Sequence, residues 1–227
     1  MFDPTVGGNV LNNSAISQDI PKTTLSNQIF NMTRNGSVML KFGNGDGPKI
    51  LLSVGVHGDE PQANIAGMMY IEYLKDKKFN GTLYIIPFDI PQDTAKDTRY
   101  YNGADPNRIA TTGGTPSWKI VQFAHENGVQ YLIDMHSGPS VGSNGLLYVN
   151  PSPTTDEKNL ANYIVSRTNC STSVDKEDSP SMIRDAAHSY GINSITLEVE
   201  RDDTPVMTAS MAEYKMLTAA TQYLGLP

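Results

Sequence analysis

The chain has 227 residues, 38% of them hydrophobic, and a formal net charge of −7 at pH 7. This length suits a single domain with a full core, and the acidic balance argues against binding to nucleic acid or to an anionic membrane surface. No apolar run approaches the roughly 20 residues that a membrane span needs.

Cysteine content and the N-terminus give little information about the compartment. Cys170 is the only cysteine, so no disulfide can form within the chain, and a lone cysteine does not report the redox compartment. The first residues lack the basic and apolar pattern of a signal peptide. The many polar residues, with Asn-x-Ser/Thr sites at Asn31 and Asn80, favour a secreted or cell-surface protein over a cytoplasmic one.

The first half of the chain is predicted to alternate strands and helices after an irregular start. Residues 1–20 are polar and lack periodicity, which predicts an extended N-terminal arm outside a catalytic domain of residues 21–227. We then expect, in chain order, a helix over 26–35, strands over 37–42 and 50–56, a helix over 60–75 and a strand over 82–87. Glycine-rich residues 43–47 predict a hairpin between the first two strands. Residues 88–115 form a long connection, and such loops are often functional.

The second half continues the same alternation. We expect helices over 116–127, 154–168, 179–190 and 207–224, and strands over 129–136, 145–150 and 192–199. Strands that alternate with helices predict an α/β fold, in which one sheet is covered by helices on both faces. In such folds the active residues gather at strand ends along one edge of the sheet.

Two apolar segments end in candidate metal ligands. His57 and Glu60 follow one predicted strand within a His-Gly-Asp-Glu sequence, and His136 ends another. Gly58 tolerates the unusual backbone dihedral angles needed in a sharp turn that would bring His57 and Glu60 to one point. Two imidazoles and one carboxylate with an open fourth position are typical of a catalytic Zn²⁺ site. The alternative is a surface pair of His57 and Glu60 beside a structural His136.

Carboxylates near these ligands are candidates for proton transfer and for ligand orientation. A carboxylate beside zinc-bound water can accept its proton. We choose Glu198 for this role because it lies inside an apolar strand, whereas Glu200 is expected to be more solvated; the alternative for Glu198 is a strand-end ion pair. Asp105 and Asp134 are candidates to bind the remote nitrogens of the metal-ligating histidines.

Arginines in the long connection are candidates for substrate binding. Arg99 and Arg108 lie within it, and Asn107 precedes Arg108. Guanidinium groups bind carboxylates through two parallel hydrogen bonds. The alternative for Arg108 is an ordinary solvated surface charge.

Four short motifs occur in the order that is typical of the zinc carboxypeptidase superfamily. They are His57-Gly58-Asp59-Glu60, Asp105-Pro106-Asn107-Arg108, His136-Ser137 and Thr196-Leu197-Glu198. Over residues 48–224 the chain therefore resembles this superfamily, which includes the M14-like metallocarboxypeptidases and the succinylglutamate desuccinylase/aspartoacylase deacylases. Each motif is weak alone, but four in order form a strong signal.

The resemblance implies a role for each matching residue. The zinc ligands would be His57, Glu60 and His136, around one ion, and the general base and acid would be Glu198. Asn107 and Arg108 resemble the pair that holds the carboxylate of the substrate, Arg99 the arginine that polarises the scissile carbonyl, and Asp105 the partner of His57. The implied fold is a single mixed, mostly parallel, twisted sheet.

The activity implied is hydrolysis of an amide bond next to a carboxylate-bearing residue. A carboxypeptidase-type peptidase, acting on cell-wall peptides if the protein is secreted, is the first expectation. The alternatives are an N-acyl amino acid deacylase, whose branch the His-Gly-Asp-Glu form resembles more closely, and a non-catalytic binding module. The chain ends soon after its last helix, so we expect no C-terminal β-domain of the aspartoacylase type. Tyr148 and Tyr190 are candidates for the substrate tyrosine of the digestive enzymes.

Overall fold

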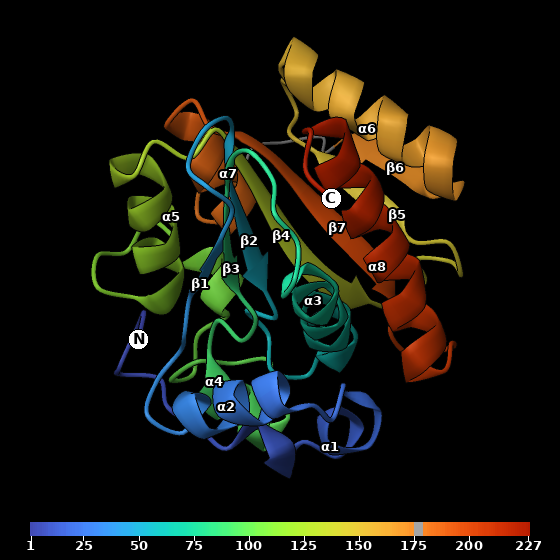
Figure 1. The fold of residues 1–227 in the computed structure, drawn as a ribbon. Coiled ribbons are helices and arrows are strands. Elements are labelled where there is room, and N and C mark those ends of the chain that lie inside the picture. Colours follow the sequence, from blue (N-terminus) through green and yellow to red (C-terminus); the bar gives the residue numbers. More distant parts are fainter. Residues whose placement is uncertain (175–178) are drawn as a thin grey trace.

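The computed structural model describes residues 1–174 and 179–227, which form a seven-stranded sheet with helices on both faces (Figure 1). Its strands are β1 (Leu40–Phe42), β2 (Lys49–Val54), β3 (Thr82–Ile86), β4 (Tyr131–Gly138), β5 (Leu146–Val149), β6 (Ser171–Val174) and β7 (Asn193–Glu200). Its helices are α1 (Ser14–Asp19), α2 (Thr24–Thr33), α3 (Pro61–Leu74), α4 (Pro91–Lys96), α5 (Pro116–Glu126), α6 (Thr155–Thr168), α7 (Ile183–Ser189) and α8 (Val206–Tyr223), with short 3₁₀ turns η1 (Val10–Asn12) and η2 (Pro106–Arg108). Among the described residues, no helix combines the length and apolar character needed to cross a bilayer. The predicted α/β class is confirmed.

The strand order places parallel strands at the centre of the sheet. The order is β1-β3-β2-β4-β7-β5-β6, and β3, β2, β4 and β7 run parallel, while β1 and β5 are antiparallel to their neighbours β3 and β7. The chain moves outward in one direction from β2 to β3 and in the other from β4 to β7. Ligands of such sheets bind at the carboxyl ends of the strands where the order reverses, which here is the edge formed by β2, β4 and β7.

Buried residues of the central strands pack against helices on both sides. Leu52 faces the core that includes α3, α6 and α8, and its neighbour Leu51 faces the core that includes α5 and α7. Successive side chains of a strand point to opposite faces, so a strand covered on both faces reads as a continuous apolar run. This explains why β2 and β4 were recognisable in the sequence.

Residues 1–20 are not the extended arm that their composition predicts. They contain η1 and α1, and Val6, Val10 and Ile16 are completely buried. Their apolar residues are few and irregularly spaced, so no periodicity marks them, but they are buried because the segment packs against the rest of the fold. The predicted conformation is wrong, while the division into an arm and a domain stays a prediction.

The hairpin predicted at residues 43–47 is also wrong. β1 pairs with β3, and both edges of β2 are occupied by the parallel strands β3 and β4. The glycine-rich turn therefore carries the chain across β3 instead of folding it back onto β1. A turn sequence specifies a change of direction, but the pairing depends on strands that come later in the chain.

Two further segments differ in detail from the predictions. The long connection of residues 88–115 contains the short helices α4 and η2, and α7 begins at Ile183 rather than at Ser179. The N–H of Ser179 is instead bound by the side chain of Asp185, and Met182 is extended. The edge strand β6 was not predicted, because its exposed residues are mostly polar.

Candidate active site

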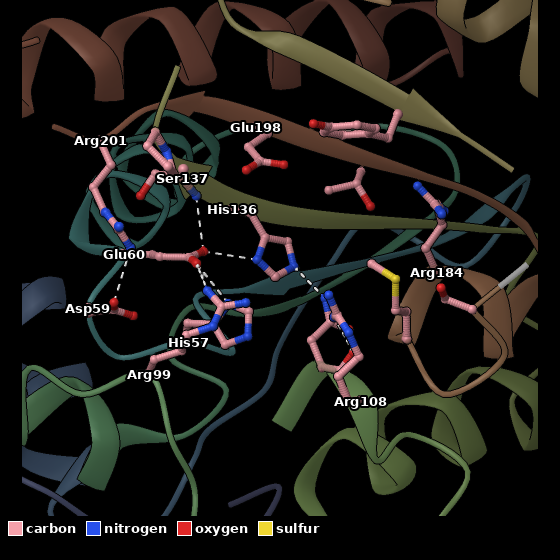
Figure 2. Close-up of a pocket in the computed structure, with 17 residues that line it drawn as sticks. His57, Asp59, Glu60, Arg99, Arg108, His136, Ser137, Arg184, Glu198 and Arg201 are labelled. Carbon is pink, nitrogen blue, oxygen red and sulfur yellow. Dashed lines mark hydrogen bonds and ion pairs between the residues drawn. The ribbon is translucent and has the colours of Figure 1, made fainter. Parts of the chain in front are cut away.

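His57, Glu60 and His136 meet at the carboxyl edge of the central strands. His57 follows β2, Glu60 directly precedes α3, and His136 lies near the end of β4. The Nδ1 atom of His57 is 2.7 Å from Glu60 Oε1, and Nδ1 of His136 is 2.9 Å from Glu60 Oε2 (Figure 2). One ligand atom from each residue lies within 4.8 Å of the others, and all three side chains are buried.

The remote nitrogens of the two imidazoles face carboxylates. Nε2 of His57 lies 2.8 Å from Asp105 Oδ1, and Nε2 of His136 lies 2.9 Å from Asp134 Oδ2. A carboxylate in this position fixes the ring and its tautomer, so that the other nitrogen can bind a metal. In both rings the nitrogen left for a metal is Nδ1, and both Nδ1 atoms point at Glu60.

The pKa shifts of Glu60 and His136 agree with a cluster that favours positive charge at its centre. Burial alone raises the pKa of Glu60, but the His136 and His57 rings hold the pKa of this carboxyl well below its usual range. Burial lowers the pKa of His136, yet Asp134 and Glu60 raise it well above the ordinary histidine value. Two buried imidazole nitrogens and a buried carboxylate are a donor set that fits a divalent metal such as zinc, so the residues are compatible with a metal ion.

Gly58 is required between the ligands because of close packing. A Cβ at this position would lie 2.1 Å from backbone atoms of Asp93, and the Gly58 N–H donates to the Thr98 carbonyl oxygen at 2.9 Å. Its φ is not in the left-handed region, unlike that of Gly55 at +67°. The sequence-based reason for Gly58, unusual dihedral angles, is therefore wrong, and contact with α4 replaces it. Pro61 then starts α3 at its first position, where a missing N–H does no harm.

Glu198 lies beside the metal-ligand cluster without belonging to it. It pairs with His136 in the register of β7 and β4, is half-buried and lines the cleft. Burial raises the pKa of Glu198 above its usual value, against the lowering effect of His136. A carboxylate with a raised pKa is a better proton acceptor near neutral pH.

Glu200 is not the solvated residue that its neighbours in the sequence suggest. It is 5% exposed and accepts a hydrogen bond of 2.8 Å from the backbone N–H of Val141 and one of 3.1 Å from that of Asp202. These bonds hold the loop after β4 against the end of β7. Glu198 rather than Glu200 lines the cleft, and its catalytic role stays a prediction, but the reason given for setting Glu200 aside was wrong.

Gly138 offers a way to displace Glu198 without touching it. A Cβ on Gly138 would lie 2.1 Å from Glu198 Oε1, the end of a flexible side chain. We expect Gly138→Ala to fold with a melting temperature close to that of the unmodified protein and to lower kcat by about 10-fold to 100-fold, since a displacement near 1 Å at a reacting group can have this effect. Kinetics and thermal unfolding check this expectation, and an unchanged kcat would show that the position of Glu198 does not matter.

The predicted arginines occupy different positions around the cluster. Arg99 Nη1 donates to Glu60 Oε1 at 3.0 Å, and its Nη2 donates to Asp105 Oδ2 at 3.0 Å. Arg108 lines the same cleft, is exposed, and donates from Nη1 to the Asn107 carbonyl oxygen at 2.8 Å. Among the residues that the structure describes, no carboxylate forms an ion pair with Arg108, so its charge is available to a ligand.

Asn107 is more engaged than its predicted role in substrate binding requires. Its Nδ2 lies 3.1 Å from His136 Nε2, and its Oδ1 accepts the Ile183 N–H at 2.8 Å. The side chain is buried and links a candidate metal ligand to the start of α7. The Asn107 Oδ1 atom is thus engaged by Ile183, and Nδ2 cannot donate to His136 Nε2 while the proton on that nitrogen is directed at Asp134. Because Arg108 is exposed in the cleft, it is the better placed of the pair for substrate.

Two arginines of the cleft were not singled out from the sequence. Arg184 of α7 is 1% exposed, lines the cleft and donates from Nε to Asp185 Oδ1 at 2.7 Å. Arg201 follows β7 and donates to Asp59 Oδ2 at 3.0 Å. This pair and Arg184 lie on opposite sides of Glu60 (Figure 2). Arg184 lies in the helix that was predicted over residues 179–190, but no motif of the sequence marked it as a cleft residue.

The cleft that these residues line has a volume of about 700 Å³. Tyr148 lies in its wall, whereas Tyr190 does not line it, is 45% exposed and stacks on His125 with ring centroids 4.3 Å apart. Of the two tyrosine candidates, only Tyr148 is therefore placed to meet a ligand in this conformation. Its position leaves the predicted tyrosine role open.

Comparison with known families identifies this combination of fold and motifs. The family model of the succinylglutamate desuccinylase/aspartoacylase catalytic domain matches residues 46–221. The chain belongs to this family. The predicted resemblance to this branch is confirmed. A search of curated proteins finds no significant match.

Solved structures with the same fold have low sequence identity to this member of the succinylglutamate desuccinylase/aspartoacylase family. Product-bound cell shape determinant protein Csd4 from Helicobacter pylori aligns with a TM-score of 0.71 at 14% identity, covering 85% of this chain and 56% of that one. The succinylglutamate desuccinylase/aspartoacylase from Rhodobacter sphaeroides aligns at 0.62 with 21% identity, covering 86% and 62%. A metallo-carboxypeptidase from Burkholderia cenocepacia aligns at 0.60 with 15% identity, covering 82% and 61%. The chain thus spans somewhat more than half the length of these structures.

Proposed function

We propose that the protein is a zinc-dependent hydrolase that cleaves an amide bond next to a carboxylate-bearing residue, most simply as a carboxypeptidase-type peptidase. The observation that carries this proposal is the presence, in one cleft, of the His57–Glu60–His136 cluster, the carboxylate of Glu198 and the exposed guanidinium of Arg108. The first two suit hydrolysis, and the third selects a substrate with a negative charge.

Zinc would be held by Nδ1 of His57, Nδ1 of His136 and the Glu60 carboxylate, and it would act as a Lewis acid that makes water nucleophilic at neutral pH. Glu198 takes a proton from the attacking water and delivers it to the departing amine, because it lies at the same edge and its pKa is raised by burial. Arg99, already bound to Glu60, adds positive charge where the carbonyl oxygen becomes negative.

The end of the cleft near α7 would hold the residue that is released. Arg108 binds its free carboxylate, since a guanidinium and a carboxylate form two parallel hydrogen bonds. The buried Arg184 lies in the wall of the same cleft, and it favours a polar or anionic group on that residue over an apolar one.

Arg108→Ala tests the carboxylate anchor. We expect KM for substrates with a free carboxylate to rise by about 10-fold to 100-fold, the value of a hydrogen-bonded charge at ~1.5–3 kcal/mol, with little change for carboxyl-amidated analogues. Arg34→Ala, which removes an exposed arginine outside the cleft, is the matched control. An equal loss on both kinds of substrate would contradict the anchor.

Two substrate classes remain for this site. Helicobacter pylori Csd4 is described as a D,L-carboxypeptidase and has been solved in tripeptide-bound and mDAP-bound forms, which supports peptides of the cell wall and a secreted or cell-surface location. The family match supports an N-acyl amino acid deacylase instead. Release of C-terminal residues from peptides, measured against release of small acids from acyl amino acids, distinguishes them.

A binding module without activity is the third candidate. Such a module would have the same fold, but binding alone does not require two oriented imidazoles, a glutamate with a raised pKa and an exposed arginine in one cleft. Protein that takes up no zinc at neutral pH and hydrolyses neither substrate class would favour the binding module.

A further inference from the structure

Residues 1–20, here called the N-terminal segment, lie outside the stretch that the family model matches, which begins at residue 46. They nevertheless pack against the edge of the sheet at which the candidate active site lies. The Gln92 N–H, in α4, donates to the Val6 carbonyl oxygen at 3.0 Å, and a Cβ on Gly8 would lie 2.5 Å from backbone atoms of Pro91 and Gln92. In Figure 1, α1 and α2 lie with α4 at the end of the sheet toward which β2 and β4 point. The segment therefore reaches the same α4 whose Asp93 backbone supports Gly58.

Asn13 makes the most direct connection between this segment and the metal-ligand turn. It is 3% exposed, and its Oδ1 accepts the Ile16 N–H at 3.2 Å, which caps α1. Its Nδ2 donates to Asp97 Oδ1 at 2.9 Å and lies 3.5 Å from the Gly58 carbonyl oxygen. One buried amide thus contacts both the turn between His57 and Glu60 and the end of α4.

Both residues that Asn13 contacts are close in sequence to residues of the candidate metal site. Gly58 directly follows His57, and Asp97 stands two residues before Arg99, whose guanidinium binds Glu60. Asp97 has a left-handed backbone conformation, with φ of +52°, which directs the chain away from α4 toward Arg99. A side chain that fixes Asp97 and Gly58 together fixes the distance between the two segments that position Glu60.

We propose that Asn13 is a positioning residue of the metal site, through which the N-terminal segment holds the His57–Glu60 turn against the Arg99 segment. The inference rests on the proposed function for the identity of the metal, but the positioning itself is a property of the metal-free protein. The rival interpretation is that Asn13 only caps α1, and the two interpretations differ in which half of the amide matters.

Asn13→Asp separates the two halves. Aspartate caps a helix as well as asparagine does, but it has no donor for Gly58 and places a second carboxylate beside Asp97. We expect faster amide hydrogen exchange at residues 57–60 and 97–99 in metal-free protein, with unchanged exchange in the central strands, and a zinc dissociation constant about tenfold higher, at the lower end of the effect of groups that orient metal ligands. Asn13→Ser, a good cap too short to reach Gly58, should do the same without the added charge.

A rescue and a control complete the test. Asp97→Asn combined with Asn13→Asp restores a hydrogen bond between positions 13 and 97 in the reverse sense, and asparagine tolerates the left-handed conformation. Exchange at residues 97–99 should therefore return to the unmodified rate and zinc affinity should recover in part, whereas residues 57–60 should stay fast because position 13 still has no donor for the Gly58 carbonyl oxygen. Asn12→Asp adds the same charge at the exposed neighbour and should have no effect. Asn13→Asp and Asn13→Ser proteins with unmodified exchange at residues 57–60 would overturn the inference. Unmodified protein that binds no zinc would refute the proposed function, while exchange would still decide the role of Asn13.

Discussion

Glu198→Gln is expected to lower kcat by about 10²-fold to 10⁴-fold, the usual range for loss of a general base, while zinc content stays unchanged. Glutamine has the same shape but cannot accept a proton from water. Glu198 is not among the cluster of candidate ligands, so the metal site should survive. Turnover and metal content, measured on the same preparation, check this result.

Asp202→Asn serves as the matched control for Glu198. Asp202 is a carboxylate on the segment just after β7, but it is exposed and binds Arg201 rather than lining the cleft. Its neutralisation should leave kcat within about twofold. If Glu198→Gln behaves like Asp202→Asn, proton transfer must be assigned to another group.

Glu60→Gln is expected to weaken zinc binding by more than about 100-fold, beyond the 10-fold to 100-fold effect of groups that only orient ligands, and to remove activity with it. The Glu60 carboxylate faces both histidines and also accepts the Ser137 N–H at 3.0 Å. Glutamine removes the charge and turns an N–H toward a ring nitrogen or toward Arg99. Zinc titration by calorimetry and kcat/KM at saturating zinc measure the two effects.

Glu72→Gln gives the control on the same helix. Glu72 lies in α3, but it accepts hydrogen bonds from Thr23 and Ser26 rather than from the histidines. The Glu72→Gln variant should bind zinc as tightly as the unmodified protein. Full zinc binding and full turnover in Glu60→Gln would remove this residue from the site.

The sequence predicted that His57, Glu60 and His136 come together, and the reason is physical. A parallel strand buried on both faces is a continuous apolar run, so polar residues at its end are conspicuous, as His57 and His136 are. Carboxyl ends of parallel strands share one edge, which brings these residues together with Glu198. The α/β architecture follows from the same alternation of apolar runs and amphipathic segments.

The parts that the sequence did not predict depend on contacts between distant segments. Val6 and Val10 are buried because residues 1–20 pack against α4 and its neighbours. The sequence of these residues has no hydrophobic periodicity, so it resembled that of an extended arm. The carboxylate of Glu200 is buried, and backbone N–H groups of Val141 and Asp202 donate to it in place of water. Arg184 lies in the cleft although no motif marks it, and Ser179, where the helix was expected to begin, instead donates its N–H to the Asp185 side chain.

The most direct test is anomalous diffraction at the zinc edge from a crystal soaked with zinc and a small carboxylate. The account predicts one strong peak about 2.0–2.1 Å from Nδ1 of His57 and of His136 and in contact with Glu60, with the carboxylate bound to Arg108. A crystal in which zinc is absent from this position, or in which His57 and His136 do not share an ion, would contradict it.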